Sequence, residues 1–242
     1  MEPSIWSPIE SMLTQCILLL QALRDPSRPD HQLAFTTLKT EVASSDFVLH
    51  MLHIFSRGYD QSLVSIGLTS DLRQLSGLVL KNYSILHFGK LSHPVQLLIE
   101  TEILHAIADT LPDIRKTSFI LMGKIASSFP ISSWSQLFLT LISLLDSSNF
   151  LQVDGALASI KLICEDACDK LVNGDGNLVA ILIPKLLHMF KSEESLFRLH
   201  ALDCMVALLA FLPVATAPIP MSIPLFIQEL SALATDPSPR VN

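Results

Sequence analysis

The chain has 242 residues, of which 50% are hydrophobic, and its formal net charge is -7. This apolar content excludes wholesale disorder, which requires low hydrophobicity and high net charge, and the length allows one or two compact domains. The acidic balance disfavours nucleic acid as a ligand, because binding to phosphates depends on lysine and arginine.

Amphipathic helices account for nearly all of the chain. Apolar residues recur at three- and four-residue steps, which is typical of helices that bury one face. In chain order, the sequence predicts helices over residues 8–23, 31–42, 47–55, 72–88, 97–109, 114–127, 134–145, 153–167, 178–190 and 196–212. Residues 57–70 contain two glycines and are expected to form a loop. The expected fold class is therefore all-α.

A regular spacing of arginines links these helices. Arg73 and Arg115 are 42 residues apart, Arg198 lies 83 residues beyond Arg115, and Arg240 follows Arg198 by 42. Each interval near 42 residues holds two helices, and the arginine stands near the start of the second one. Paired helices at this period are typical of HEAT repeats. The sequence predicts an α-solenoid of about five helical pairs and a truncated sixth.

The last of these arginines stands close to the end of the chain. Arg240 marks the place where the second helix of a repeat should begin, and the chain ends at Asn242. A finished solenoid ends in a polar capping repeat. We therefore expect residues 1–242 to be the N-terminal HEAT-repeat arch of a longer protein, truncated at its C-terminus.

Two charge-free runs raise the question of membrane insertion. Residues 125–145 are interrupted by Pro130 and several serines, and residues 204–228 contain four prolines. Proline repeatedly breaks a helix that is exposed to lipid. Buried helices joined by loops, with a proline-rich loop over 213–224, are therefore expected, without membrane insertion. The N-terminus has no secretory signal.

The sequence contains no recognisable catalytic, metal or cofactor motif. His50 and His53 share a helix but form no HExxH motif, and there is no GxSxG elbow, glycine-rich phosphate loop, GKS or GKT. The four cysteines, Cys16, Cys164, Cys168 and Cys204, lack paired metal-ligand spacing and are expected to be free thiols. We expect no enzyme activity, cofactor or metal, and keep an unrecognised active site as the weakest alternative.

The recurring arginines Arg73, Arg115, Arg198 and Arg240 allow two interpretations. They could bind a partner on an inner face, or they could form a structural ladder in which each pairs with an aspartate or a carbonyl of the neighbouring repeat. Because their spacing matches the repeat itself, the sequence favours the ladder.

Two polar pairs on second helices are candidates for contacts with a partner. Glu165 and Asp166 are expected at the end of a helix, where carboxylates oppose the helix dipole. Such an unfavourable placement suggests an external basic partner, although a solvated surface fits equally well. Lys81 and Asn82 have a similar position on the helix predicted over 72–88.

Several motifs follow one another over nearly the whole chain. They are Trp6 with Pro8, SGLVLKN at 76–82, PDIRKT at 112–117, LLDS at 144–147, DGALASIKLICED at 154–166 and IPKLLHMF at 183–190. In these motifs the chain resembles the N-terminal region of the transportin (karyopherin-β2) nuclear import receptors, within the importin-β superfamily. The SGLVLKN motif alone is shared with the wider superfamily.

The resemblance implies a function that the spacing does not. In the family, second helices of the N-terminal repeats line a concave arch that binds the GTP form of the small GTPase Ran. Lys81, Asn82, Glu165 and Asp166 are then candidate Ran contacts, and Ran would be the direct partner. The alternative is a HEAT-repeat scaffold or adaptor that binds proteins without GTPase dependence.

The resemblance also implies a domain organisation and a place of action. An importin-β N-terminal-like region is expected within about 8–90, followed by further HEAT repeats over 91–242. Import cargo and nucleoporins are expected partners of the full-length protein, in the cytoplasm and nucleus.

Overall fold

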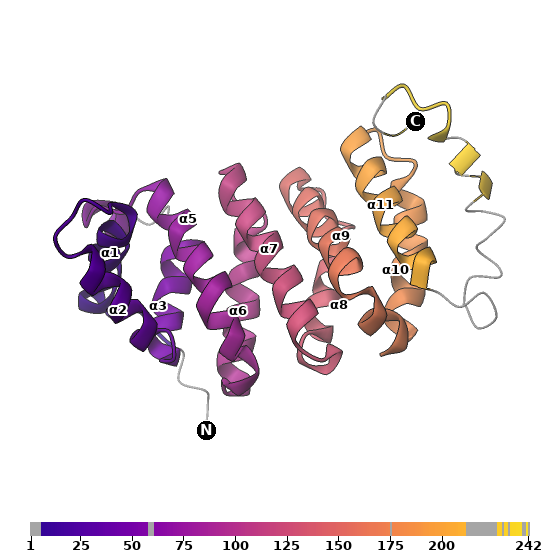
Figure 1. The fold of residues 1–242 in the computed structure, drawn as a ribbon. Coiled ribbons are helices and arrows are strands. Elements are labelled where there is room, and N and C mark those ends of the chain that lie inside the picture. Colours follow the sequence, from indigo (N-terminus) through magenta and orange to yellow (C-terminus); the bar gives the residue numbers. More distant parts are fainter. Residues whose placement is uncertain are drawn as a thin grey trace. The chain divides into compact units, whose positions relative to one another are not determined.

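The computed structural model describes residues 6–57, 61–174 and 176–211, with 227–228, 230–231, 233–238 and 241. The chain divides into two compact units, Met1–Ile125 and Ala126–Asn242. The described residues form helices and no strand, so the all-α prediction is confirmed over this part of the chain (Figure 1).

The first unit is built from helices α1 to α6 and most of α7. Their bounds are α1 (Glu10–Arg24), α2 (His31–Glu41), α3 (Ser45–Ser56), α4 (Gln61–Ser65), α5 (Ser70–Val79), α6 (His93–Ala106) and α7 (Pro112–Ser128). A π-helical turn, Leu80–Ser84, and a 3-10 helix, Ile85–Lys90, lie between α5 and α6. Helix α3 packs against α1, α5 and α6, and α5 lies beside α7 (Figure 1). Paired helices in two layers result, as expected of helical repeats.

The second unit repeats this arrangement with two further pairs. A 3-10 turn, Ile131–Ser133, precedes α8 (Ser135–Leu144), α9 (Phe150–Asn173), α10 (Gly176–Met189) and α11 (Ser195–Phe211). Helix α9 packs against α11, α8 packs against α10, and each first helix contacts its own second helix. In Figure 1, α9 and α11 form one layer of this unit and α8 and α10 the other.

Local sequence explains where several helices begin. The side chains of Ser44, Thr69 and Asn149 accept hydrogen bonds from backbone N–H groups in the first turns of α3, α5 and α9. Such N-caps satisfy donors that have no partner inside the helix. Helix α6 instead carries a proline in its first turn, where no N–H is required.

The core of the first unit centres on α3. Met51, Leu52, Ile54 and Phe55 are almost fully buried because three helices surround α3. Burial of each such side chain contributes roughly 1.5–3 kcal/mol. Gly77 of α5 allows the closest approach: a Cβ atom there would lie 2.6 Å from the Phe55 ring and 2.6 Å from Thr117 of α7.

The chain before α1 is fixed by His50 of α3. The Ile9 N–H donates to Nε2 of His50 at 3.0 Å, while Nδ1 lies 2.7 Å from the Asp46 carbonyl oxygen. Because a backbone N–H can only donate, Nε2 must be unprotonated and Nδ1 must carry the hydrogen. Trp6 contacts the same imidazole edge-on, at 5.1 Å between ring centroids.

The prediction of one helix over 72–88 is wrong in its second half. The α-helical pattern ends at Val79 and gives way to the π-helical turn and the 3-10 helix. Leu80 and Phe88 are both buried, and they line the same small internal space as Ile103 of α6. Positions eight residues apart on a regular α-helix differ by about 80° in direction, so the change of helix type lets both residues reach one core.

The prediction of a loop over 57–70 is also only partly correct. Helix α4 lies within this segment, and its Leu63 is fully buried. Gly67 has a φ of 92°, which favours glycine, and the chain turns there before α5 begins.

The other boundaries differ by a few residues, except at α9. The structure extends α9 to Asn173, beyond the predicted end at 167, with a kink at Ala167. The proline-rich segment 213–224 and Arg240 lie outside the described residues. No helix in the described part of the chain is both long and apolar enough to cross a membrane.

Candidate functional site

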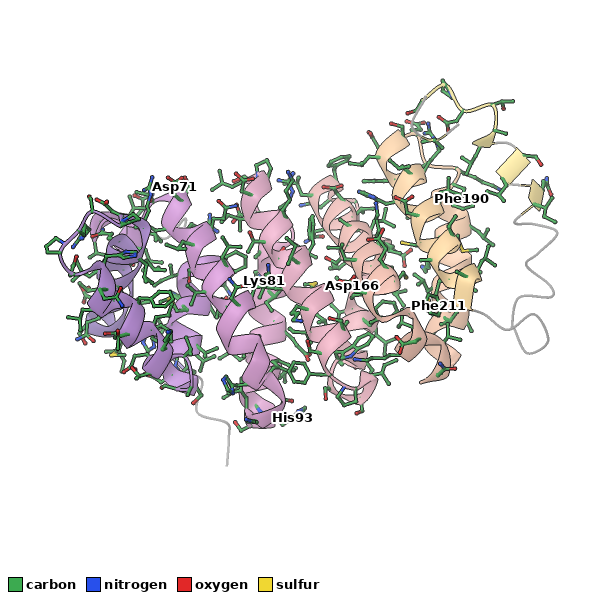
Figure 2. The ribbon with its side chains drawn as sticks, viewed as in Figure 1. Asp71, Lys81, His93, Asp166, Phe190 and Phe211 are labelled. Carbon is green, nitrogen blue, oxygen red and sulfur yellow. The ribbon has the colours of Figure 1, made fainter. Side chains whose placement is uncertain are left out.

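Lys81 and Asn82 lie in the π-helical turn that follows α5 (Figure 2). The neighbouring Leu80 is buried, Lys81 is half-buried and Asn82 is exposed. Within the described residues, neither side chain has a hydrogen bond or an ion pair. The π-helical turn thus leaves a cation and an amide available at the surface, and such turns are frequent at functional sites.

Glu165 and Asp166 lie on α9, and both are exposed. Glu165 Oε1 is 3.8 Å from Lys161 Nζ, and Asp166, labelled in Figure 2, has no partner among the described residues. These carboxylates directly precede Ala167, whose backbone is non-helical and divides α9 into two helical segments. They therefore stand in the last turn of the first helical segment of α9, where carboxylates oppose the helix dipole, and their selection as partner contacts stays a prediction.

Lys161 is held mainly by the neighbouring helix. Its Nζ lies 2.6 Å from Asp203 Oδ2 on α11. Burial lowers the pKa of Lys161, but the hydrogen bond to Asp203 and the negative charges of Asp203 and Glu165 together outweigh it and raise the pKa above its usual value. Because Lys161 is committed to Asp203, the negative charge of Glu165 is only weakly compensated.

His200 of α11 lies close to this charged pair. Burial, followed by the positive charge of Lys161, lowers the pKa of His200. Its Nδ1 atom is buried and has no hydrogen-bond partner among the described residues. The residues around Lys161 therefore combine one paired cation, a buried imidazole with a lowered pKa and the exposed carboxylates of α9.

Arg73 and Arg115 meet at Asp109, between α6 and α7. Arg73 Nη2 donates to Asp109 Oδ2 at 2.6 Å and to the Phe55 carbonyl oxygen at 2.9 Å. Arg115 Nη1 donates to the carbonyl oxygen of Asp109 at 2.8 Å. Arg73 and Asp109 are both about 95% buried, so their charges compensate each other away from water.

Arg198 has the same kind of environment in the second unit. It forms two hydrogen bonds to Asp236, at 2.5 and 2.8 Å, and its Nη1 donates to the Ser192 and Glu193 carbonyl oxygens. The Arg198 guanidinium lowers the pKa of the Asp236 carboxyl. Arg240 lies outside the described residues, and the role of the four arginines in a ladder stays a prediction.

The sequence interpretation missed the acidic partners of these arginines. Asp109 follows Arg73 by 36 residues and Asp236 follows Arg198 by 38, so only the repeat length connects them. The sequence feature that could have identified these partners is an aspartate near the turn between paired helices. A third missed carboxylate is Glu102 of α6, which binds Arg57: burial raises its pKa, but hydrogen bonds from Arg57 and Ser56 lower it overall.

Lys170 of α9 was also missed as a structural residue. Its Nζ donates to the carbonyl oxygens of Ala126, Ser127 and Phe129, at 2.6 to 3.1 Å. These carbonyls include the last turn of α7, where a cation compensates both unpaired acceptors and the helix dipole.

No set of three or more His, Cys, Asp or Glu residues in the described part of the chain could hold a metal ion. Cys16, Cys164, Cys168 and Cys204 are free and buried, as expected.

Comparison with curated proteins gives a consistent set of relatives. The chain is 31% identical to transportin-1 of Homo sapiens over 98% of this chain and 25% of that protein. It is 28% identical to transportin of Dictyostelium discoideum over 98% of this chain, and 28% identical to importin subunit beta-2 of Schizosaccharomyces pombe over 72%. The chain spans about a quarter of the length of the transportins it matches.

No family model matches the chain. Among solved structures, it is similar to a designed armadillo repeat protein in complex with peptide (KR)4, with 14% identity, a TM-score of 0.42 and coverage of 94% of this chain and 95% of the other. Over nearly its whole length, the chain is a homologue of the N-terminal region of transportin-1, and over 72% of its length it is also similar to importin subunit beta-2.

Proposed function

We propose that this chain is the N-terminal part of a nuclear import receptor of the transportin type, and that it binds the GTP form of Ran. The observation that carries the proposal is the 31% identity to human transportin-1 across 98% of this chain. Such a receptor is not an enzyme and acts by binding. Import cargo and nucleoporins are partners of the full-length protein, which works in the cytoplasm and nucleus.

Lys81, Asn82, Glu165 and Asp166 are the proposed Ran contacts. Support for this choice comes from their availability, since Lys81, Asn82 and Asp166 have no partner within the described residues and Glu165 has only a distant one. Lys81 would bind a carboxylate of Ran, while Glu165 and Asp166 would bind lysine or arginine. Complementary charges of this kind accelerate association and make it sensitive to salt.

The proposed mechanism is a coupling between two ligands of the full-length receptor. Ran in its GTP form and cargo would favour different curvatures of the solenoid, so that each lowers the affinity for the other. Residues 1–242 would contribute the Ran-binding part of this mechanism.

Retention of Ran by the immobilised chain tests the proposal. Ran is loaded with a non-hydrolysable GTP analogue or with GDP, and its binding is measured by titration. We expect selective binding of the GTP form, because a transportin-type receptor distinguishes the two states. Equal binding of both forms, or no binding, favours the alternative of a scaffold without GTPase dependence.

A further inference from the structure

A groove runs between α1 and α2. None of the proposed Ran contacts lines it. Helix α1 packs against α3 and α5 with Leu13, Ile17 and Leu20 buried, whereas α2 packs chiefly on α1 and buries only Ala34 and Leu38. The groove has a volume of about 370 Å³. Its lining includes Met12, Cys16, Leu19, Leu33, Ala34 and Thr37.

Two leucines flank this groove and are open to solvent. Leu18 of α1 is 53% exposed and Leu33 of α2 is 68% exposed. Single exposed leucines are ordinary, but these two border the same apolar depression. A contiguous apolar depression that is open to solvent is more typical of a binding surface than isolated exposed leucines are.

The charged residues that line the groove are both acidic. Asp30 directly precedes α2 and Glu41 is its last residue, so they stand about 16 Å apart along the helix. Arg28 binds Asp30 at 2.8 and 2.9 Å. Glu41 is exposed and has no partner within the described residues. One end of the groove therefore carries an uncompensated negative charge.

This negative potential reaches the floor of the groove. Cys16 is 2% exposed there, and its thiol pKa is raised to about 12, first by burial and then by the charges of Asp46 and Glu41. The apolar lining of the groove and the negative charge at one end therefore favour a ligand that has an apolar face and a positively charged end.

We propose that the α1–α2 groove binds an amphipathic helix of a partner protein, with apolar side chains between Leu18 and Leu33 and a lysine or arginine beside Glu41. A helix laid along two helices would complete a three-helix contact, which is a common mode of peptide recognition. A second copy of this chain fits less well, because two such grooves laid together bring no positive charge to Glu41 from their own lining, which has no lysine or arginine.

Two synthetic peptides test the proposal. Each is an amidated helix of roughly 15 residues with leucines at i, i+3, i+4, i+7 and i+11, and it carries lysines at its ends in one version and glutamates in the other. Fluorescence anisotropy with the full 242-residue chain gives both affinities. We expect the lysine version to bind at least about tenfold more tightly, with a difference that shrinks as salt is added.

Variants locate the binding. Leu33→Asp should weaken the lysine peptide at least about tenfold, whereas Val206→Asp, at a 58% exposed position of α11, should leave its affinity unchanged. Glu41→Lys should reverse the order of the two peptides, and Glu193→Lys, also at an exposed position, should preserve it. All four positions are exposed, so circular dichroism should show unchanged helix content.

Three results would overturn the proposal. The first is equal affinity for the two peptides, or no binding of either at about 1 mM, a concentration that detects even weak complexes. The second is an equal effect of Leu33→Asp and Val206→Asp. The third is a dimer in sedimentation equilibrium that Leu33→Asp dissociates, because the groove would then be occupied by a second copy. Ran binding uses other residues and is measured separately, so the two proposals fail independently.

Discussion

At the scale of single residues, the buried pair Arg73–Asp109 is the most consequential interaction of the first unit. Arg73 connects the Phe55 carbonyl of α3 to the turn that leads into α7. Both side chains are almost entirely removed from water. Loss of one partner leaves the other charge buried without compensation, which is far more unfavourable than loss of a surface ion pair.

Arg73→Ala should therefore lower the free energy of unfolding by about 3–5 kcal/mol. Urea denaturation followed by circular dichroism measures this change. Arg24→Ala is a matched control, because the Arg24–Asp71 pair is more than half exposed and should contribute under about 1 kcal/mol. Equal losses in the two variants would contradict the ladder interpretation.

Glu100 of α6 makes the stability of the first unit depend on pH. It is 6% exposed, and burial raises its pKa to about 7. Since the folded-state pKa lies above the unfolded value, the contribution of Glu100 to stability is fully present below about pH 4.5 and is lost as pH rises through about 7.

The chain should therefore lose about 2–3 kcal/mol of stability through Glu100 between pH 5 and pH 8. Glu100→Gln, which stays neutral, should remove this loss and stabilise the protein at pH 8. Urea titrations at both pH values make the comparison. A variant with the same pH dependence as the parent chain would show that Glu100 is ionised without cost.

At the scale of helices, the sequence predicted that a helix is present more reliably than it predicted where the helix ends or whether its type changes. Ten helices follow from apolar periodicity, because each buries one face against a neighbour. Helix α4 escaped this reasoning, since five residues with one buried side chain, Leu63, show no period. The π-helical turn was not predicted either, because a shift in the backbone hydrogen-bond pattern does not change the amino-acid composition.

The candidate residues were predictable only in part. Lys81, Asn82, Glu165 and Asp166 came from their places on second helices and from family resemblance, and the structure leaves them exposed or half-buried. Asp109 and Asp236 could not be found by local patterns, because their arginines lie almost a full repeat earlier in the chain.

Lys170 provides a test at this scale, because one side chain serves two helices. Lys170→Ala leaves the carbonyls of Ala126, Ser127 and Phe129 without their cation. We expect a loss of about 1–3 kcal/mol and faster hydrogen exchange at the end of α7. Lys116→Ala, at an exposed position of the same helix, is the control and should leave both unchanged. Exchange that stays slow in Lys170→Ala would exclude a capping role.

At the scale of the whole molecule, the proposed function requires contributions from both units. Lys81 belongs to Met1–Ile125 and Asp166 to Ala126–Asn242. Each residue is proposed to bind a charge of opposite sign on Ran. If both do so, affinity depends on each unit separately, and the effects of substitutions in the two units should add.

Lys81→Glu and Asp166→Lys should each weaken binding of the GTP form of Ran about tenfold, which corresponds to about 1.4 kcal/mol. The double variant should lose about the sum of these energies. Glu193→Lys changes charge by the same amount as Asp166→Lys at another exposed position and should bind normally. If only Lys81→Glu weakens binding, the contact is confined to the first unit.

Gly77 limits which substitutions the chain can tolerate. Even the smallest side chain at that position would overlap the ring of Phe55 and the methyl group of Thr117. In a library that randomises codon 77 and selects for soluble expression, glycine should therefore dominate the survivors. Any other surviving residue should carry a second substitution that shrinks position 55 or 117.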